Sequence, residues 1–182
     1  MTERGLSQIP ATLRARLAKV KLFLCDVDGV LTNATVSIGN NTEFKTFNIL
    51  DGLGMRLLQR EGIKIGWVSN RPSPATEQRA TELKIDFLHQ QDGNKVEGAD
   101  EIVKRAGVSW DEVCFVGDDL VDLGVLKRAG LAVVVANGVG EAKALAHYVT
   151  KARGGEGAVR ELAELILKAQ NKWERVVQKY SE

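Results

Sequence analysis

The chain has 182 residues, of which 44% are hydrophobic and 27% charged, and its formal net charge is +1 at pH 7. This composition fits one globular domain with a sizeable core and gives no electrostatic reason to expect nucleic acid or an anionic membrane as a partner. No apolar run reaches the roughly 20 residues that span a bilayer, and residues 1–20 lack a signal-peptide core. Cys25 and Cys114 lie in apolar runs, which favours buried free thiols and a cytoplasmic location.

The N-terminal part of the chain predicts a frayed end, one helix and one strand. We expect residues 1–8 to be frayed and residues 10–19 to form a helix, because Pro10 suits a first helical position. Residues 22–25 are apolar without interruption, which is typical of a parallel strand buried on both faces.

A β-hairpin is predicted within residues 33–47. Apolar residues alternate weakly around Gly39-Asn40-Asn41, and glycine and asparagine tolerate the positive φ angles of a tight turn. Phe44 and Phe47 are large side chains for so small a hairpin. We therefore expect either the rest of the domain or another subunit to cover them.

Helices and apolar strands alternate through the rest of the chain. Strands are predicted at residues 63–68, 85–88, 113–116, 131–135 and 148–149, and helices at 53–61, 75–83, 95–105, 123–128, 141–146 and 158–180. This alternation predicts an α/β fold of three layers, Rossmann-like, with a mainly parallel sheet from which the hairpin projects. No repeat or second domain is visible, so residues 1–182 are predicted to form a single domain.

Polar residues follow four of the predicted strands. Asp26 and Asp28 follow the first, Ser69 the second and Lys95 the third, and the pair Asp118-Asp119 follows the fourth. The carboxyl ends of parallel strands share one edge of a sheet, so these side chains are expected to converge.

Such a group has the chemistry of a phosphate site. Carboxylates from two strands make an all-oxygen site suited to Mg²⁺, while a serine hydroxyl and a lysine charge suit a dianionic phosphate. Taken singly, each has a structural alternative: Ser69 and Asp51 as helix caps, Lys95 as a solvated side chain, and Asp118-Asp119 as a turn.

The motifs in this order resemble those of the haloacid dehalogenase superfamily of phosphotransferases. The matching residues are 26–32 (Asp-Val-Asp-Gly-Val-Leu-Thr), Ser69, Lys95 and 117–122 (Gly-Asp-Asp-Leu-Val-Asp). Response-regulator receivers use similar groups, but there the acidic pair comes first and the phosphorylated aspartate lies on a later strand.

Further stretches resemble the superfamily's capless phosphatases for sugar acid phosphates. They are Gly39-Asn40-Asn41, Phe47-Asn48, Asp51-Gly52-Leu53-Gly54, Arg71, Asn94-Lys95 and Gly157-Ala158-Val159-Arg160-Glu161. Only residues 29–68 and 70–94 separate the first three motifs, which leaves no room for a cap domain of typical minimum size, roughly 50 residues. The resemblance implies a homotetramer whose projecting hairpins close neighbouring sites.

The resemblance also implies roles for the acidic residues. Asp26 would be the nucleophile that forms an aspartyl phosphate, and Asp28 the general acid and base. Mg²⁺ would bind the Asp26 carboxylate, the Asp28 backbone carbonyl and Asp118. Asp119 and Asp122 would orient metal-bound waters or Lys95.

The remaining roles concern the phosphate and the sugar acid. Ser69, Asn70 and Lys95 would hold the phosphoryl oxygens, and Asn70 stands where the family usually has glycine. Arg71, Asp51 and Arg160 would contact the substrate, with the Arg71 guanidinium paired to its carboxylate. Arg71 could instead only cap its helix.

The function implied is Mg²⁺-dependent hydrolysis of an eight-carbon sugar acid phosphate in lipopolysaccharide precursor synthesis. Relatives that act on nine-carbon substrates tend to carry glutamate at the position of Arg71. Two alternatives stay open: a nine-carbon or other sugar phosphate as substrate, and a non-catalytic tetramerising module. The presence of Asp26, Asp28, Lys95 and Asp118 argues against the module, because assembly does not need them.

Overall fold

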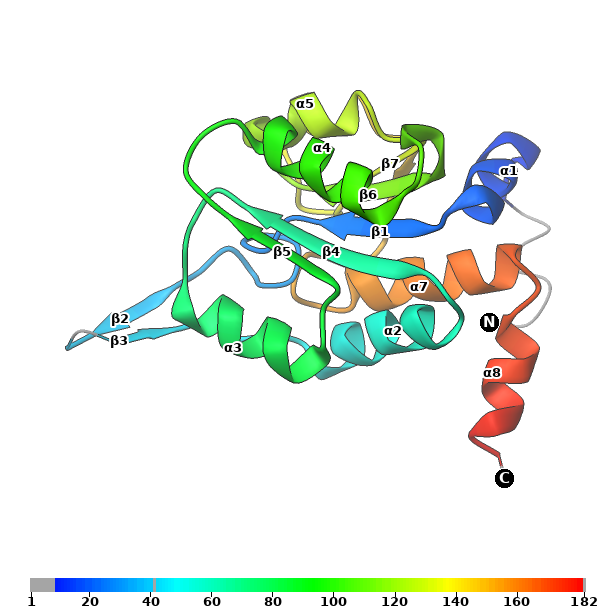
Figure 1. Ribbon diagram of the computed structural model, residues 1–182, viewed down its shortest axis with the longest axis horizontal. Coiled ribbons are helices and arrows are strands. Elements are labelled where there is room, and N and C mark those ends of the chain that lie inside the picture. The colour runs from blue at the N-terminus through cyan, green and yellow to red at the C-terminus, as the bar shows by residue number, and fades with distance from the viewer. Residues whose placement is uncertain (1–8, 41, 182) are drawn as a thin grey trace.

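A six-stranded sheet forms the centre of the computed structural model, which describes residues 9–40 and 42–181 (Figure 1). The strands are β1 (Leu22–Cys25), β4 (Lys64–Ser69), β5 (Phe87–Gln90), β6 (Val113–Gly117), β7 (Leu131–Val134) and β8 (Tyr148–Val149). All neighbours pair in parallel, in the order β5-β4-β1-β6-β7-β8. The predictions for residues 1–8 and for Asn41 lie outside the described residues.

Helices cover both faces of this sheet. The elements are α1 (Ala11–Lys19), α2 (Ile49–Arg60), α3 (Pro74–Leu83), α4 (Lys95–Ala106), η2 (Trp110–Glu112), η3 (Leu120–Asp122), α5 (Leu123–Leu126), α6 (Gly140–Lys143), α7 (Ala158–Ala169) and α8 (Trp173–Lys179). Side chains of α1, α2, α3 and α7 form one apolar cluster with the sheet, and those of α4, α5 and α6 form a second. The prediction of a three-layer α/β fold is confirmed.

The side chains of β1 contribute to the apolar clusters on both faces of the sheet. Its four side chains are fully buried, and they alternate between the clusters because successive residues of a strand point to opposite faces. Phe23 and Cys25 belong to the first cluster, and Leu22 and Leu24 to the second. Cys25 and Cys114 are both free and buried, as the sequence predicted.

The predicted hairpin projects from the body of the molecule as strands β2 (Ser37–Gly39) and β3 (Thr42–Phe44), at the left of Figure 1. The strands are antiparallel, with Gly39 opposite Thr42. Phe47 is covered by its own domain, because its ring stacks on Trp67 with centroids 6.3 Å apart. Phe44 is 63% exposed and Ile38 is 80% exposed.

Three of the element boundaries that differ from the predictions have a clear local cause. α2 begins at Ile49, four residues early, because the Asn48 side chain accepts hydrogen bonds from the backbone of Leu50 and Asp51. β5 begins two residues late, because Lys84 ends α3 in the left-handed conformation (φ 52°) and Ile85 still bonds back to that helix. Pro10 precedes α1 as its N-cap and is not its first residue.

The predicted helix 158–180 is two helices. α7 ends at Ala169, and Asn171 has φ 56°, a left-handed conformation that asparagine tolerates and that stops a helix. α8 then runs away from the sheet (Figure 1). Within the described residues, no helix combines the length and the apolar character needed to cross a membrane.

Candidate active site

Asp26 lies at the carboxyl end of β1, in the middle of the sheet. Its backbone N–H donates to Val116 O, and its Oδ1 accepts from the N–H of Val27 (2.7 Å) and lies 3.0 Å from Lys95 Nζ. Burial and the neighbouring Asp122 raise the pKa of Asp26 to about 7, although Lys95 acts in the opposite direction. A buried carboxylate of this kind requires a cation or a chemical role to offset its desolvation.

Lys95 connects Asp26 to the loop after β6. It is the first residue of α4, which the Asn94 side chain caps, and its ammonium is 2.7 Å from Asp122 Oδ1. Burial alone would lower the pKa of Lys95, but Asp26 and Asp122 together raise it. The other oxygen of Asp122 accepts from the backbone N–H groups of Asp118 (2.8 Å) and Asp119 (3.3 Å), so Asp122 orients both the lysine and the loop.

Asp118 has the features of a metal ligand. Its Oδ1 is buried without a hydrogen-bond partner, and burial followed by the charges of Asp26 and Asp122 raises its pKa to about 8. Asp26, Asp118 and Asp122 each offer an oxygen, and these three atoms lie within 4.8 Å of one another. Since Asp122 is already engaged, the available oxygens belong mainly to Asp26 and Asp118. This hard, all-oxygen set fits Mg²⁺.

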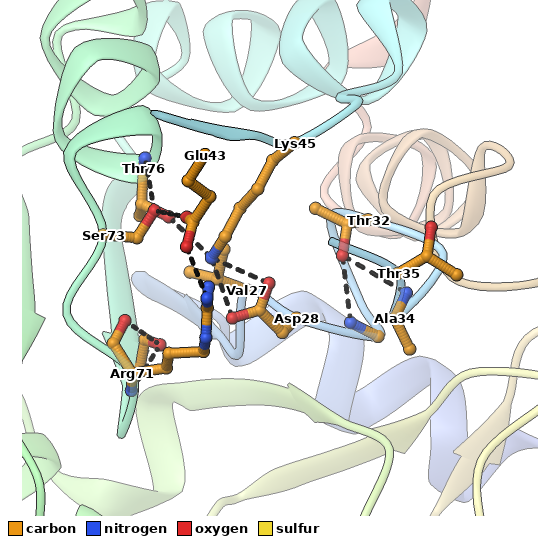
Figure 2. A network of polar contacts seen from close by, with 12 residues as sticks. Val27, Asp28, Thr32, Ala34, Thr35, Glu43, Lys45, Arg71, Ser73 and Thr76 are labelled. Atoms are coloured by element: carbon orange, nitrogen blue, oxygen red, sulfur yellow. Dashed lines mark hydrogen bonds and ion pairs between the residues drawn. The ribbon is translucent and has the colours of Figure 1, made fainter. Parts of the chain in front are cut away.

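Gly29 makes the space that Asp118 occupies. Its φ is +97°, and a Cβ built at this position would lie 2.0 Å from Asp118 Oδ2. Thr32 shapes the same turn, because its buried hydroxyl accepts from the N–H group of Gly29. The same hydroxyl accepts from the N–H group of Ala34 (Figure 2). The turn after β1 therefore requires glycine for a backbone and a steric reason.

Asp28 faces a residue that sequence reasoning missed. Lys45 Nζ lies 2.8 Å from each carboxylate oxygen of Asp28 and 3.1 Å from Thr76 Oγ1, and the Lys45 side chain has no exposed surface (Figure 2). No motif marks Lys45, because it is a single lysine just after the hairpin, far from Asp28 along the chain. Only the docking of the hairpin brings the two together.

Arg71 contacts the hairpin as well. Its guanidinium pairs with the carboxylate of Glu43 on β3, and the Ser73 hydroxyl donates to the same carboxylate (Figure 2). These contacts, with the Arg71 hydrogen bond first, hold the pKa of Glu43 below its usual value. The arginine predicted to bind a substrate carboxylate thus holds a carboxylate of its own chain.

Ser69 and Asn70 lie at the carboxyl end of β4. Ser69 is buried, and its Oγ accepts from the N–H of Arg71 (3.1 Å). The Asn70 Nδ2 donates to Gly93 O (2.6 Å), which ties this loop to the loop before α4, and the Asn70 Oδ1 is buried without a partner.

Three further predicted site residues make contacts within the protein itself. Asp119 Oδ1 accepts from Leu120 N–H (2.6 Å) and caps η3. Asp51 is buried, and its carboxylate accepts from the N–H groups of Arg160 (2.7 Å) and Gly157 (3.3 Å), at the start of α7. The Arg160 side chain pairs with Glu164 and lies over the Trp173 ring. Substrate contact by Asp51 and Arg160 stays a prediction.

Comparison with known proteins agrees with this geometry. A family model described as haloacid dehalogenase-like hydrolase matches residues 84–162. The 3-deoxy-D-manno-octulosonate 8-phosphate phosphatase of Yersinia pestis is 39% identical over 160 residues, which cover 87% of this chain and 86% of that protein.

Two solved structures are similar over nearly their whole length. A probable YrbI family phosphatase from Pseudomonas syringae has a TM-score of 0.91 at 38% identity, covering 95% of this chain and 99% of that one. The 3-deoxy-D-manno-octulosonate 8-phosphate phosphatase of Moraxella catarrhalis, in complex with magnesium ion, phosphate ion and KDO, has a TM-score of 0.88 at 36% identity, covering 92% and 97%.

A parallel sheet with a buried aspartate–lysine group and a magnesium-compatible acidic cluster at its carboxyl edge defines a haloacid dehalogenase-type phosphoric monoester hydrolase. The similarity extends over most of the chain and of its relatives. The chain belongs to the family of 3-deoxy-D-manno-octulosonate 8-phosphate phosphatases.

Proposed function

We propose that this chain hydrolyses 3-deoxy-D-manno-octulosonate 8-phosphate to the free sugar acid and phosphate, as a step in lipopolysaccharide precursor synthesis. The observation that carries the proposal is the group of Asp26, Lys95 and Asp118 at the carboxyl edge of the sheet. It combines a buried carboxylate 3.0 Å from a lysine ammonium with a buried carboxylate oxygen that has no partner. Family membership supports the choice of substrate.

Asp26 and Asp28 would divide the chemistry between them. An Asp26 oxygen attacks phosphorus, the bond from phosphorus to the sugar oxygen breaks, and Asp28 gives that oxygen a proton. Water then attacks the aspartyl phosphate and loses a proton to Asp28, while the bond from phosphorus to Asp26 breaks. The net reaction consumes one water and restores both carboxyl groups.

Residues around Asp26 would bind the phosphate and the metal. The Asp26 and Asp118 carboxylates and the Asp28 backbone carbonyl would hold Mg²⁺, which screens the phosphate charge from the incoming carboxylate. Lys95, Ser69 and the loop at Asn70 would hold the phosphoryl oxygens. Asp122 fixes Lys95 by direct contact, and Asp119 would orient water on the metal.

The sugar acid would lie between the site and the hairpin. Arg71 is the proposed partner of its carboxylate, which would exchange with Glu43 on the guanidinium. A nine-carbon sugar acid phosphate is the second candidate substrate, and Arg71 favours the eight-carbon one by the family pattern. Asp51 and Arg160 stay proposed as substrate contacts on the strength of the matching motif alone.

A homotetramer and a cytoplasmic location complete the proposal. Ile38 and Phe44 leave a projecting hairpin with large exposed apolar side chains, which is typical of a protein interface. Light scattering at micromolar concentration tests the assembly, and a monomer would contradict it. Two free cysteines suit a reducing compartment.

Phosphate release is the decisive measurement. Purified protein with Mg²⁺ should release phosphate fastest from the eight-carbon substrate when eight- and nine-carbon sugar acid phosphates are compared. Asp26→Asn should remove this activity while circular dichroism shows an unchanged fold. Turnover by Asp26→Asn would disprove the nucleophile, and a folded wild-type protein without phosphatase activity would favour the tetramerising module.

A further inference from the structure

Lys45 is a buried lysine that neither the family motifs nor the proposed chemistry uses. Its side chain has no exposed surface, and its ammonium contacts only Asp28 and Thr76 among the described residues. Burying an ammonium is costly unless its charge and its hydrogen-bonding capacity are both satisfied. Asp28 satisfies the charge, so a fully buried ammonium is paired with a carboxylate whose side chain is 28% exposed.

The hairpin delivers Lys45 to this place. Lys45 directly follows β3 and lies two residues after Glu43, so the extended chain turns both side chains to the same side, while Phe44 between them is exposed. Glu43 binds Arg71 and Ser73, and Lys45 binds Asp28 and Thr76, so two ion pairs of opposite polarity tie the hairpin to its own subunit (Figure 2). A register shift of one residue would lose both pairs.

We propose that Lys45 is the positioning residue for Asp28, and that the hairpin is thereby part of the catalytic apparatus of its own subunit. The two oxygens of Asp28 are equally distant from the ammonium, at 2.8 Å. One oxygen can therefore turn to the sugar oxygen or to water while the other stays bound to Lys45. This inference rests on the proposed role of Asp28 as acid and base.

Thr76 makes Lys45 a rigid support. Its hydroxyl lies 3.1 Å from the ammonium, and its backbone N–H binds the Ser73 hydroxyl at the first turn of α3. Thr76 is fully buried. Lys45 is therefore held between a helix and Asp28, which fixes where the carboxylate can point.

The test compares leaving groups in Lys45→Met. A sugar alkoxide needs a proton to leave, whereas nitrophenolate does not, but both substrates need Asp28 to activate water afterwards. Since general acid–base catalysis contributes about 10²–10⁴-fold, we expect kcat for the sugar acid phosphate to fall about 10- to 100-fold with little change in KM. With p-nitrophenyl phosphate, rapid mixing should show a preserved burst of nitrophenolate, followed by slow turnover.

Two further variants complete the experiment. Lys45→Arg should recover most of the turnover, because a guanidinium can bind both carboxylate oxygens. Lys64→Met is the matched control, since Lys64 lies at the opposite end of β4 and donates to Ala106 O, and its kinetics should equal those of the wild type. If Lys45→Met does not fold, Lys45→Gln is measured in the same way.

Three results would overturn the proposal. They are an unchanged kcat in the folded variant, a kcat above that of the wild type, which would make Lys45 a restraint, and equal loss of the burst and of turnover. The proposed substrate is judged separately. If the wild type cleaves only p-nitrophenyl phosphate, the sugar acid assignment fails while the burst still decides the role of Lys45.

Discussion

The ion pairs at the two ends of the parallel sheet differ in how far they are buried. At the carboxyl end, the side chains of Lys95, Asp26 and Asp122 are 2%, 8% and 0% exposed, and the Lys95 ammonium lies 3.0 Å from Asp26 and 2.7 Å from Asp122 as two ion pairs. At the amino end, Lys19 and Asp111 are 63% and 66% exposed and 3.9 Å apart. Exposed pairs of this kind contribute little to stability, whereas buried ones are costly to assemble and costly to break.

This contrast indicates which end of the sheet carries the functional site. Among the residues that the structure describes, a buried carboxylate oxygen without a hydrogen-bond partner lies at the carboxyl end of the sheet. Asp118 Oδ1 is buried and unpaired there, while the amino-end acid Glu112 is bound by Lys21 and by the N–H of Ser109. An acidic group that is not fully paired lowers the stability of the fold, but its free oxygens can bind a cation.

The largest expected effect is that of Asp122→Ala. It removes one partner of a buried lysine and the acceptor for two backbone N–H groups, so we expect a loss of about 3 kcal/mol or more in the free energy of unfolding. Chemical denaturation measures it. Lys19→Ala, which breaks the exposed pair at the amino end, should leave the unfolding midpoint unchanged. Equal effects of the two substitutions would remove the contrast between the two ends.

Gly29→Ala should have the next largest effect. The added Cβ would meet Asp118 Oδ2 at 2.0 Å in a backbone with φ +97°, so we expect a loss of about 1–3 kcal/mol in stability together with weaker Mg²⁺ binding. Gly62→Ala is the control, because its φ is +84° and no atom lies within 4 Å of the added Cβ. It should lower stability but leave Mg²⁺ titrations by calorimetry unchanged. Unaltered Mg²⁺ affinity in Gly29→Ala would contradict the assignment of Asp118.

The smallest expected effect is on how stability depends on pH, and it comes from His147 near the start of β7. His147 Nδ1 accepts from Ala132 N–H (2.9 Å), and burial followed by the charge of Arg16 lowers the pKa of His147 below 6.5. Because the unfolded chain takes up this proton more readily, the stabilisation is fully present above pH 6.5 and is lost as the pH falls from 6.5 through the lower pKa of the folded state. Thermal unfolding of His147→Asn should therefore show a weaker pH dependence than the wild type between about pH 7.5 and about pH 5.5. Identical pH dependences would disprove it.

The place of several site residues was predictable because they follow strands that are easy to recognise in the sequence. Apolar runs with buried side chains predict parallel strands, and the topology of such a sheet brings their carboxyl ends together. Asp26, Ser69 and Asp118 therefore lie at one edge, as predicted, and Lys95 reaches it from the first residue of α4.

The predictions that were wrong concern the ends of helices, which the sequence marks only weakly. Asn171 ends α7 by adopting a left-handed conformation, but asparagine also occurs within helices, so the pattern over residues 158–180 continued past it. Asn48 caps α2 in preference to Asp51, and the structure uses Asp51 to cap α7 instead. A side chain that caps a helix far away in the sequence cannot be recognised from the spacing of the residues around it.

By itself, the sequence determined the order of the strands and helices and the residue types at the strand ends, because periodicity and turn chemistry are local properties. Only the tertiary structure decided that Lys45 meets Asp28 and that Glu43 occupies Arg71. The resemblance left open whether Asp122 orients Lys95 or metal-bound water, and the structure shows its contact with Lys95. Those partners lie far apart along the chain. Their pairing depends on how the hairpin and α4 pack against the sheet, which no short stretch of sequence encodes.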